Sequence, residues 1–98
     1  MKDTELIKRK IESIIQRNLY LKSFEIFDFS TLEDLGASSF EKINIILEIE
    51  KEFNISILRS YSNKIYELDF IHLLKVVEKA IVRSKQRKTL LQFFVKRK

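Results

Sequence analysis

The sequence predicts an all-α fold, an antiparallel bundle of three main helices and one short one. Its 98 residues include one glycine and no proline, so the turn residues that a set of short strands would need are missing. Apolar residues instead recur at helical spacing in three long segments. A chain of this length has room for one small hydrophobic core.

The first predicted helix covers residues 5–19. Asp3 or Thr4 can cap its start, and its apolar residues recur at the spacing that forms one stripe along a helix. The stripe consists of Ile7, Ile11, Ile14, Ile15 and Leu19. This helix is expected to form one wall of the bundle.

Residues 20–37 lack a helical period, yet they contain the large apolar residues Phe24, Phe27, Phe29 and Leu32. Because long loops in small domains are usually packed by their own side chains, we expect this segment to fold over the core. The four apolar residues are expected to anchor it there.

The remaining elements are a helix over 39–53, a short irregular or helical piece near 56–65, and a last helix over 67–82. The last helix is expected to turn four apolar residues inward, namely Phe70, Leu74, Val77 and Ile81. The predicted bundle thus spans residues 1–82. Residues 83–98 form a basic C-terminal extension that also contains apolar residues and can add a further helical segment.

The formal net charge of +5 is unevenly distributed. Residues 83–98 contain seven basic and no acidic side chains, which leaves 12 basic and 14 acidic residues in 1–82. The bundle is therefore mildly acidic and the extension makes the chain basic. Because the net positive charge comes from the extension alone, no nucleic-acid partner is expected.

No apolar run approaches the roughly 18 residues that indicate a membrane span, so we expect a soluble, cytoplasmic protein, most simply a monomer. The chain contains no cysteine. It can therefore form no disulfide and supply no thiol of its own. No grouping of residues indicates a catalytic or a metal site, and we expect no enzyme activity.

The stretch from Gly36 to Glu41 predicts a helix start with a capping box. Ser38 can accept a hydrogen bond from the backbone amide of Glu41, whose carboxylate can reach back to the amide of Ser38. Ser39 then occupies the first helical position, with its hydroxyl free to point outward. Gly36 permits a positive-φ turn before the cap, which sets the angle at which the helix start is presented.

The helix over 39–53 has two apolar stripes. Ile45, Ile46, Ile49 and Phe53 share one sector, and Phe40, Ile43 and Leu47 form a second stripe more than a third of a turn away. With glutamates nearby, the second stripe suggests a docking surface for basic partners. The alternative is that a small bundle wraps this helix and buries both stripes.

The sequence Asp34-Leu35-Gly36-Ala37-Ser38-Ser39-Phe40 resembles the D-L-G-A-D-S-L motif of the acyl carrier protein family. The helix after it ends in LEIEKEFNISI, which is similar to the acidic LEEEF of that family. The resemblance covers roughly residues 4–82 and leaves the basic tail as an atypical addition. Two positions differ, since Ser38 stands where the family has aspartate and Phe40 where leucine is usual.

The resemblance implies a four-helix carrier that is not an enzyme. Its motif serine, here Ser39, receives a covalent 4'-phosphopantetheine arm from coenzyme A through a carrier protein synthase, and acyl groups are carried on the arm as thioesters for fatty acid, lipid or polyketide-type synthesis. Gly36 and Ser38 would shape the presentation of Ser39. The resemblance places partner docking, to the synthase and to acyl-transferring enzymes, on Asp34, Phe40, Glu41, Ile43, Leu47 and Glu48.

Two alternatives to this function stay open. One is an unmodified, carrier-like interaction module that docks a partner or a membrane through its tail, and the other is an aminoacyl or peptidyl carrier. Residues 84–98 combine Leu90, Leu91, Phe93, Phe94 and Val95 with flanking Lys and Arg. Such a segment can contact an anionic membrane surface, or it can continue the last helix and fold back over the bundle.

Overall fold

The computed structural model describes residues 2–22 and 25–96, and it describes side chains for residues 4–22 and 25–85. The elements in order are α1 (Lys2–Leu19), α2 (Ser39–Phe53), α3 (Leu58–Tyr61), the 3-10 helix η2 (Ser62–Glu67) and α4 (Phe70–Lys96). In the described ranges there is no strand; one isolated β-bridge joins Thr31 to Asp69. The prediction of an all-α bundle is confirmed.

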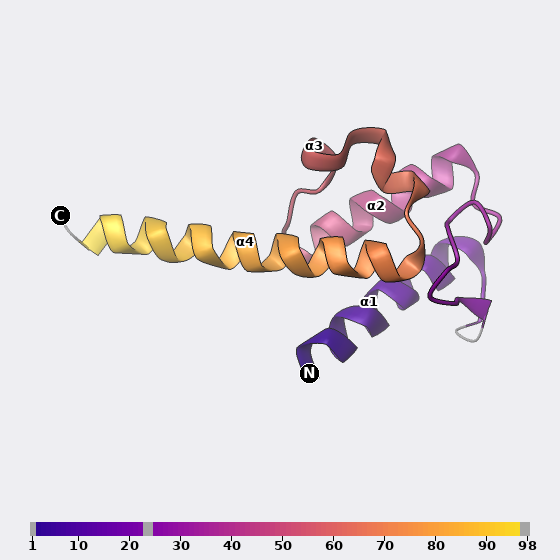
Figure 1. Cartoon of the computed structure of the whole chain (residues 1–98), viewed down its shortest axis with the longest axis horizontal. Helices are drawn as coiled ribbons and strands as arrows, with labels where there is room; N and C mark the ends of the chain where they lie inside the picture. Colours follow the sequence, from indigo (N-terminus) through magenta and orange to yellow (C-terminus); the bar gives the residue numbers. More distant parts are fainter. Residues whose placement is uncertain (1, 23–24, 97–98) are drawn as a thin grey trace.

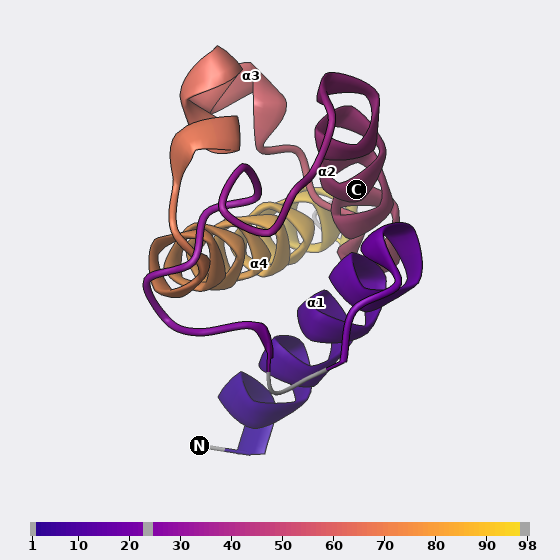
Figure 2. The same ribbon diagram turned by 90° about the vertical axis from the view of Figure 1, so that its right-hand side faces the viewer.

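The three long helices surround one core, and the short α3–η2 segment covers one side of it (Figures 1 and 2). In Figure 1, α2 and α4 both run from right to left, whereas α1 runs in the opposite sense. The start of α2 therefore lies at the end of the bundle away from the C-terminal end of α4. This placement separates residues 36–40 from the basic extension.

The core consists mainly of aliphatic side chains from α1, α2 and α4. Ile11 and Ile15 of α1 pack with Ile45, Ile46 and Ile49 of α2, and each of these five is at most 1% exposed. From α4, the inward residues are Phe70, Leu73, Leu74, Val76, Val77 and Ala80. The inward positions predicted for α1 and α4 are confirmed, with Ile7, Leu19 and Ile81 partly buried at the edges.

The long connection between α1 and α2 does cross the core, but its anchors differ from those predicted. Leu32 is buried as expected, and Ile26 joins it. The prediction was wrong for Phe27 and Phe29, which are 53% and 73% exposed and stack on one another with ring centroids 5.6 Å apart. Phe24 lies outside the described residues.

This loop anchors at the start of α4 through its backbone. The carbonyls of Ser30 and Asp28 accept hydrogen bonds from the amides of Phe70 and Ile71, at 2.7 and 2.9 Å. The first amides of a helix have no partner within the helix, so the loop satisfies two of them. Such pairing ties the loop to α4 even though two of its phenylalanines face solvent.

The last helix begins later and ends later than predicted, at Phe70 and Lys96 rather than 67 and 82. Helix α4 continues through most of the basic extension and projects beyond the bundle (Figure 1). The backbone thus does not turn back over the bundle within the part of the chain that the structure describes.

Candidate functional site

The turn before α2 is closed by backbone hydrogen bonds around Gly36. Its amide donates to the carbonyl of Glu33 at 2.9 Å, and the amide of Ala37 donates to that of Leu32 at 3.0 Å. Gly36 has φ +89°, as its position before the cap predicted. A Cβ here would meet no atom within 4 Å, so the requirement for glycine is one of backbone conformation rather than space.

The two serines differ in what their side chains bind. The Oγ of Ser38 accepts from the amide of Glu41 at 3.2 Å, and the Oε1 of Glu41 accepts from the amide of Ser38 at 2.8 Å. This is the predicted capping box. Ser39 is the first residue of α2 and is exposed. Its hydroxyl has no hydrogen-bond partner in the part of the chain that the structure describes.

Ser39 lines an open cleft of about 550 Å³ between the 31–36 turn, the start of α2 and η2. The other lining residues are Thr31, Glu33, Asp34, Lys42, Ile43, Asn63, Tyr66 and Glu67. Three carboxylates and one ammonium group therefore surround a free hydroxyl at a helix start. The amides and dipole of such a start favour an anion.

Helix α2 buries one of its apolar stripes and exposes the other. Ile45, Ile46 and Ile49 are fully buried, whereas the second stripe, Phe40, Ile43 and Leu47, is 71%, 44% and 48% exposed. The alternative in which the bundle buries both stripes is thus wrong. Exposure of these side chains forgoes the stabilisation that burial of their apolar surface would give. Together the three side chains form an apolar patch that starts next to Ser39.

The carboxylates predicted near this patch all have partners within the chain. Asp34 exchanges two hydrogen bonds with Thr31, at 3.0 and 3.1 Å, in the turn before Gly36. Glu41 belongs to the capping box. Glu48 binds α1 through an ion pair with Arg17 at 3.2 Å and a hydrogen bond from Asn18. Glu48 therefore links α2 to α1 at the rim of the patch.

The cleft also contains residues that sequence reasoning did not select. Lys42 forms an ion pair with Glu33 at 2.9 Å, and its side chain is 20% exposed. Asn63, Tyr66 and Glu67 reach the cleft because η2 packs beside the start of α2. Only Lys42 carried a signal in the sequence, since it stands one helical turn after Ser39.

Among the residues that the structure describes, one titratable group has a shifted pKa. A hydrogen bond with the His72 side chain, and a second from the His72 amide at 3.0 Å, lower the pKa of the Asp69 carboxyl below its usual 3.8. This pair caps the start of α4, and Asp69 also forms the isolated β-bridge with Thr31, which lines the cleft. Within the ranges the structure describes, there is no cluster of three His, Cys, Asp or Glu that could hold a metal ion.

None of the described helices combines the length and the apolar character that crossing a bilayer requires.

The fold and the site define a class of protein: a small helical bundle that presents an unbonded serine hydroxyl beside an apolar patch at the start of its second helix. Comparison with curated proteins finds relatives that are acyl carrier proteins. An acyl carrier protein from Buchnera aphidicola subsp. Acyrthosiphon pisum (strain Tuc7) is 37% identical over 70 residues, which cover 66% of this chain and 88% of the relative.

An acyl carrier protein from Rickettsia bellii (strain OSU 85-389) is 34% identical over 77 residues, 76% of this chain and 95% of the relative. One from Karelsulcia muelleri (strain GWSS) is 38% identical over 64 residues, 64% of this chain and 77% of the relative. No family model matches the sequence. No solved structure matches it. The chain belongs to the acyl carrier protein family, whose named members support a carrier role.

Proposed function

We propose that this chain carries acyl groups as thioesters on a 4'-phosphopantetheine arm joined to the Oγ of Ser39. The observation that carries the proposal is the division of labour between the two serines. Ser38 is committed to the capping box, whereas Ser39 is exposed, unbonded within the described chain and open to the cleft. The arm fits the chain's composition as well, since a chain without cysteine needs a thiol from outside.

Two features at Ser39 favour a phosphodiester at this position. The start of α2 offers a favourable dipole for its negative charge, and Lys42 lies one turn away with its ammonium group in the same cleft. The Lys42 side chain can leave its ion pair with Glu33 and pair with the phosphate instead, without a change in its backbone. The arm, when bound, supplies the thiol that holds the acyl group, and the chain contributes position, surface and charge.

The second stripe of α2 is the proposed docking face for the carrier protein synthase and for the enzymes that act on the acyl group. Phe40, Ile43 and Leu47 offer the apolar contact, and Asp34, Glu41 and Glu48 give the rim its negative charge. Because these carboxylates already have partners in the chain, they are held in place before a basic enzyme arrives. Fatty acid, lipid or polyketide-type synthesis is the proposed setting, and partner enzymes select the cargo.

Intact mass spectrometry tests the site. Incubation with coenzyme A, magnesium and a phosphopantetheinyl transferase should add about 340 Da, the mass of the arm, to the chain. Ser39→Ala should abolish the addition, and Ser38→Ala should retain part of it at a slower rate. Modification of Ser39→Ala, with loss of the addition in Ser38→Ala, would assign the arm to the other serine and contradict the proposal.

The same reaction tests the docking face. Leu47→Ser should slow transfer several-fold, because it removes apolar contact from the second stripe while leaving the core intact. Leu6→Ser is the matched control, since Leu6 is similarly exposed but lies on α1. Equal rates for both variants would count against docking through α2. An unmodified mass for protein purified from its own cell would favour an interaction module instead.

A further inference from the structure

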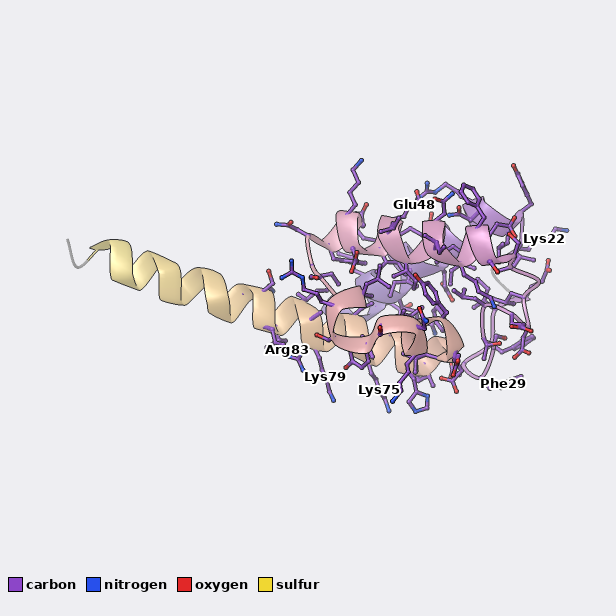
Figure 3. All side chains as sticks on the ribbon, turned by 90° about the horizontal axis from the view of Figure 1, so that it is seen from above. Lys22, Phe29, Glu48, Lys75, Lys79 and Arg83 are labelled. Carbon is purple, nitrogen blue, oxygen red and sulfur yellow. The ribbon has the colours of Figure 1, made fainter. Side chains whose placement is uncertain are left out.

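A row of cations lies on the solvent face of α4. Lys75, Lys79 and Arg83 are exposed and follow one another at intervals of four residues. Residues four apart lie on the same side of a helix, and Figure 3 shows the three side chains along one edge of the molecule. We call these three residues the cationic row. At a rise of 1.5 Å per residue, it extends over roughly 12 Å.

The cationic row has little negative charge to neutralise it. No ion pair within the described residues involves Lys75, Lys79 or Arg83. From Lys75 to Lys98 the sequence contains nine basic residues and one acidic residue, Glu78, a net charge of +8. Like charges this close repel one another, which destabilises the free protein. An anionic partner would relieve this repulsion.

Exposed apolar side chains accompany the cationic row. Val82, between Lys79 and Arg83 in the sequence, is 53% exposed. The stacked pair Phe27 and Phe29 is held beside the start of α4, because the carbonyls of Asp28 and Ser30 bind its first amides. Figure 3 shows Phe29 on the same side as Lys75. Neither phenylalanine is needed for the core.

Cations and apolar side chains together fit a lipid surface better than a nucleic acid. An anionic headgroup layer attracts Lys and Arg, and the acyl boundary beneath it accepts Phe, Val and Leu. Binding of single-stranded nucleic acid relies on stacking of bases on aromatic rings, whereas Val82 offers only aliphatic surface. The sequence beyond the described side chains continues the same mixture, with Leu90, Leu91, Phe93, Phe94 and Val95 among basic residues.

We propose that the cationic row, with the Phe27–Phe29 pair beside it, docks this protein on the surface of an anionic lipid bilayer. The projecting part of α4 extends the contact beyond the bundle. Glu48 of α2 lies at the opposite edge of the molecule in Figure 3, and α2 starts at the end away from the projecting helix. A docked molecule therefore keeps Ser39 and the second stripe accessible to enzymes.

Vesicle flotation with the full chain tests this proposal. Wild type should bind vesicles of phosphatidylcholine with one third phosphatidylglycerol and leave pure phosphatidylcholine unbound. The variant Lys75→Gln, Lys79→Gln, Arg83→Gln should bind the anionic vesicles roughly 100-fold more weakly, because each cation near the surface contributes to attraction. The matched control is Lys51→Gln, Arg59→Gln, Lys64→Gln, which removes the same charge from exposed positions on α2, α3 and η2.

The control should lose less than about 5-fold, since its cations lie on α2, α3 and η2 rather than on α4 and act mainly through the screened long-range field. Phe29→Ser should weaken binding several-fold without changing its salt dependence. Equal losses in the two triple variants would overturn the proposal, and so would equal binding to neutral vesicles. Tighter binding to a single-stranded RNA than to anionic vesicles would assign the row to nucleic acid.

Binding to lipid does not depend on the arm. Ser39→Ala should bind anionic vesicles as wild type does. The outcome of the vesicle experiment therefore does not depend on whether Ser39 is modified. Far-UV circular dichroism and thermal unfolding of each variant separate loss of binding from loss of fold, and the exposed positions chosen are expected to change stability by no more than about 0.5 kcal/mol each.

Discussion

Adjacent residues in this chain have separate tasks. Ser38 and Ser39 are chemically identical, but only the first can reach the amide of Glu41 from a cap position. The hydroxyl of the second is left free because helix geometry turns the first helical position outward. Gly36 contributes the positive φ that brings the chain into this start. The proposed site thus depends on backbone direction at three neighbouring positions.

Asp69 predicts a measurable dependence of stability on pH. Its pKa is lowered in the folded chain by hydrogen bonds with His72, so its stabilising contribution is present above about pH 4 and is lost as the pH falls through the folded value. Asp69→Asn keeps an acceptor for the cap but cannot titrate. We expect wild type to unfold at a higher temperature than Asp69→Asn at pH 7.

That difference in melting temperature should shrink on acidification to pH 3, because the wild-type carboxyl is then losing its charge. Differential scanning calorimetry of both proteins over this range gives the comparison. A difference that stays constant between pH 7 and pH 3 would show that the charge of Asp69 makes no contribution, and that the cap alone acts.

At the scale of elements, α2 contributes to the core, to the proposed docking face and to the anchoring of α1 and α3. Its buried face fills the core, its exposed second stripe is the proposed docking face, and Glu48 ties it to α1. Near its other end, the carboxylate of Glu50 accepts hydrogen bonds from the amides of Ile57 and Leu58, at 2.7 and 2.9 Å. These two bonds hold the start of α3 against α2.

Glu50→Ala should lower the free energy of unfolding by about 2 kcal/mol, because it leaves two partly buried amides without their charged acceptor. Urea unfolding measures the change. Glu52→Ala is the control on the same helix, since it removes an ion pair with Lys10 at 3.1 Å in which both side chains are 44% exposed. Its effect should stay below about 1 kcal/mol. Similar losses in both variants would argue against the anchoring role of Glu50.

At the scale of the whole molecule, charge and shape are both asymmetric. The start of α2, which holds the proposed attachment serine and borders the acidic cleft, lies at one end, and the basic helix α4 projects from the other (Figure 1). The principal extents of 52, 28 and 19 Å reflect this projection. In a carrier built in this way, the surface proposed to bind lipid is separate from the site proposed to hold the acyl group.

Small-angle X-ray scattering tests the projection. The Cα radius of gyration is 14.9 Å, whereas a compact chain of 98 residues is expected near 12.5 Å. We expect a measured value near 15 Å at the mass of a monomer. A value near 12.5 Å would mean that α4 folds back in solution, and a doubled mass would contradict the expectation of a monomer.

Local chemistry explains why so much could be predicted from the sequence. The bounds of α2 were predicted at Ser39 and Phe53 because a capping box and an apolar period act over a few residues. The buried stripes followed from the same period. The prediction that Phe27 and Phe29 anchor in the core was wrong. Burial of a loop residue depends on which part of the core the helices leave open to the loop. Ile26 and Leu32 occupy that space.

The amino-acid sequence alone determined the order of the helices, their buried stripes, the capped start of α2, the serine that this cap leaves free and the charge of the C-terminal region. All of these arise between residues close in the chain. The tertiary structure alone decided that Lys42, Tyr66 and Glu67 share a cleft with Ser39, that Glu50 anchors α3, and that Phe29 lies beside the cationic row. Those contacts join distant segments, and only the packing of the helices brings them together.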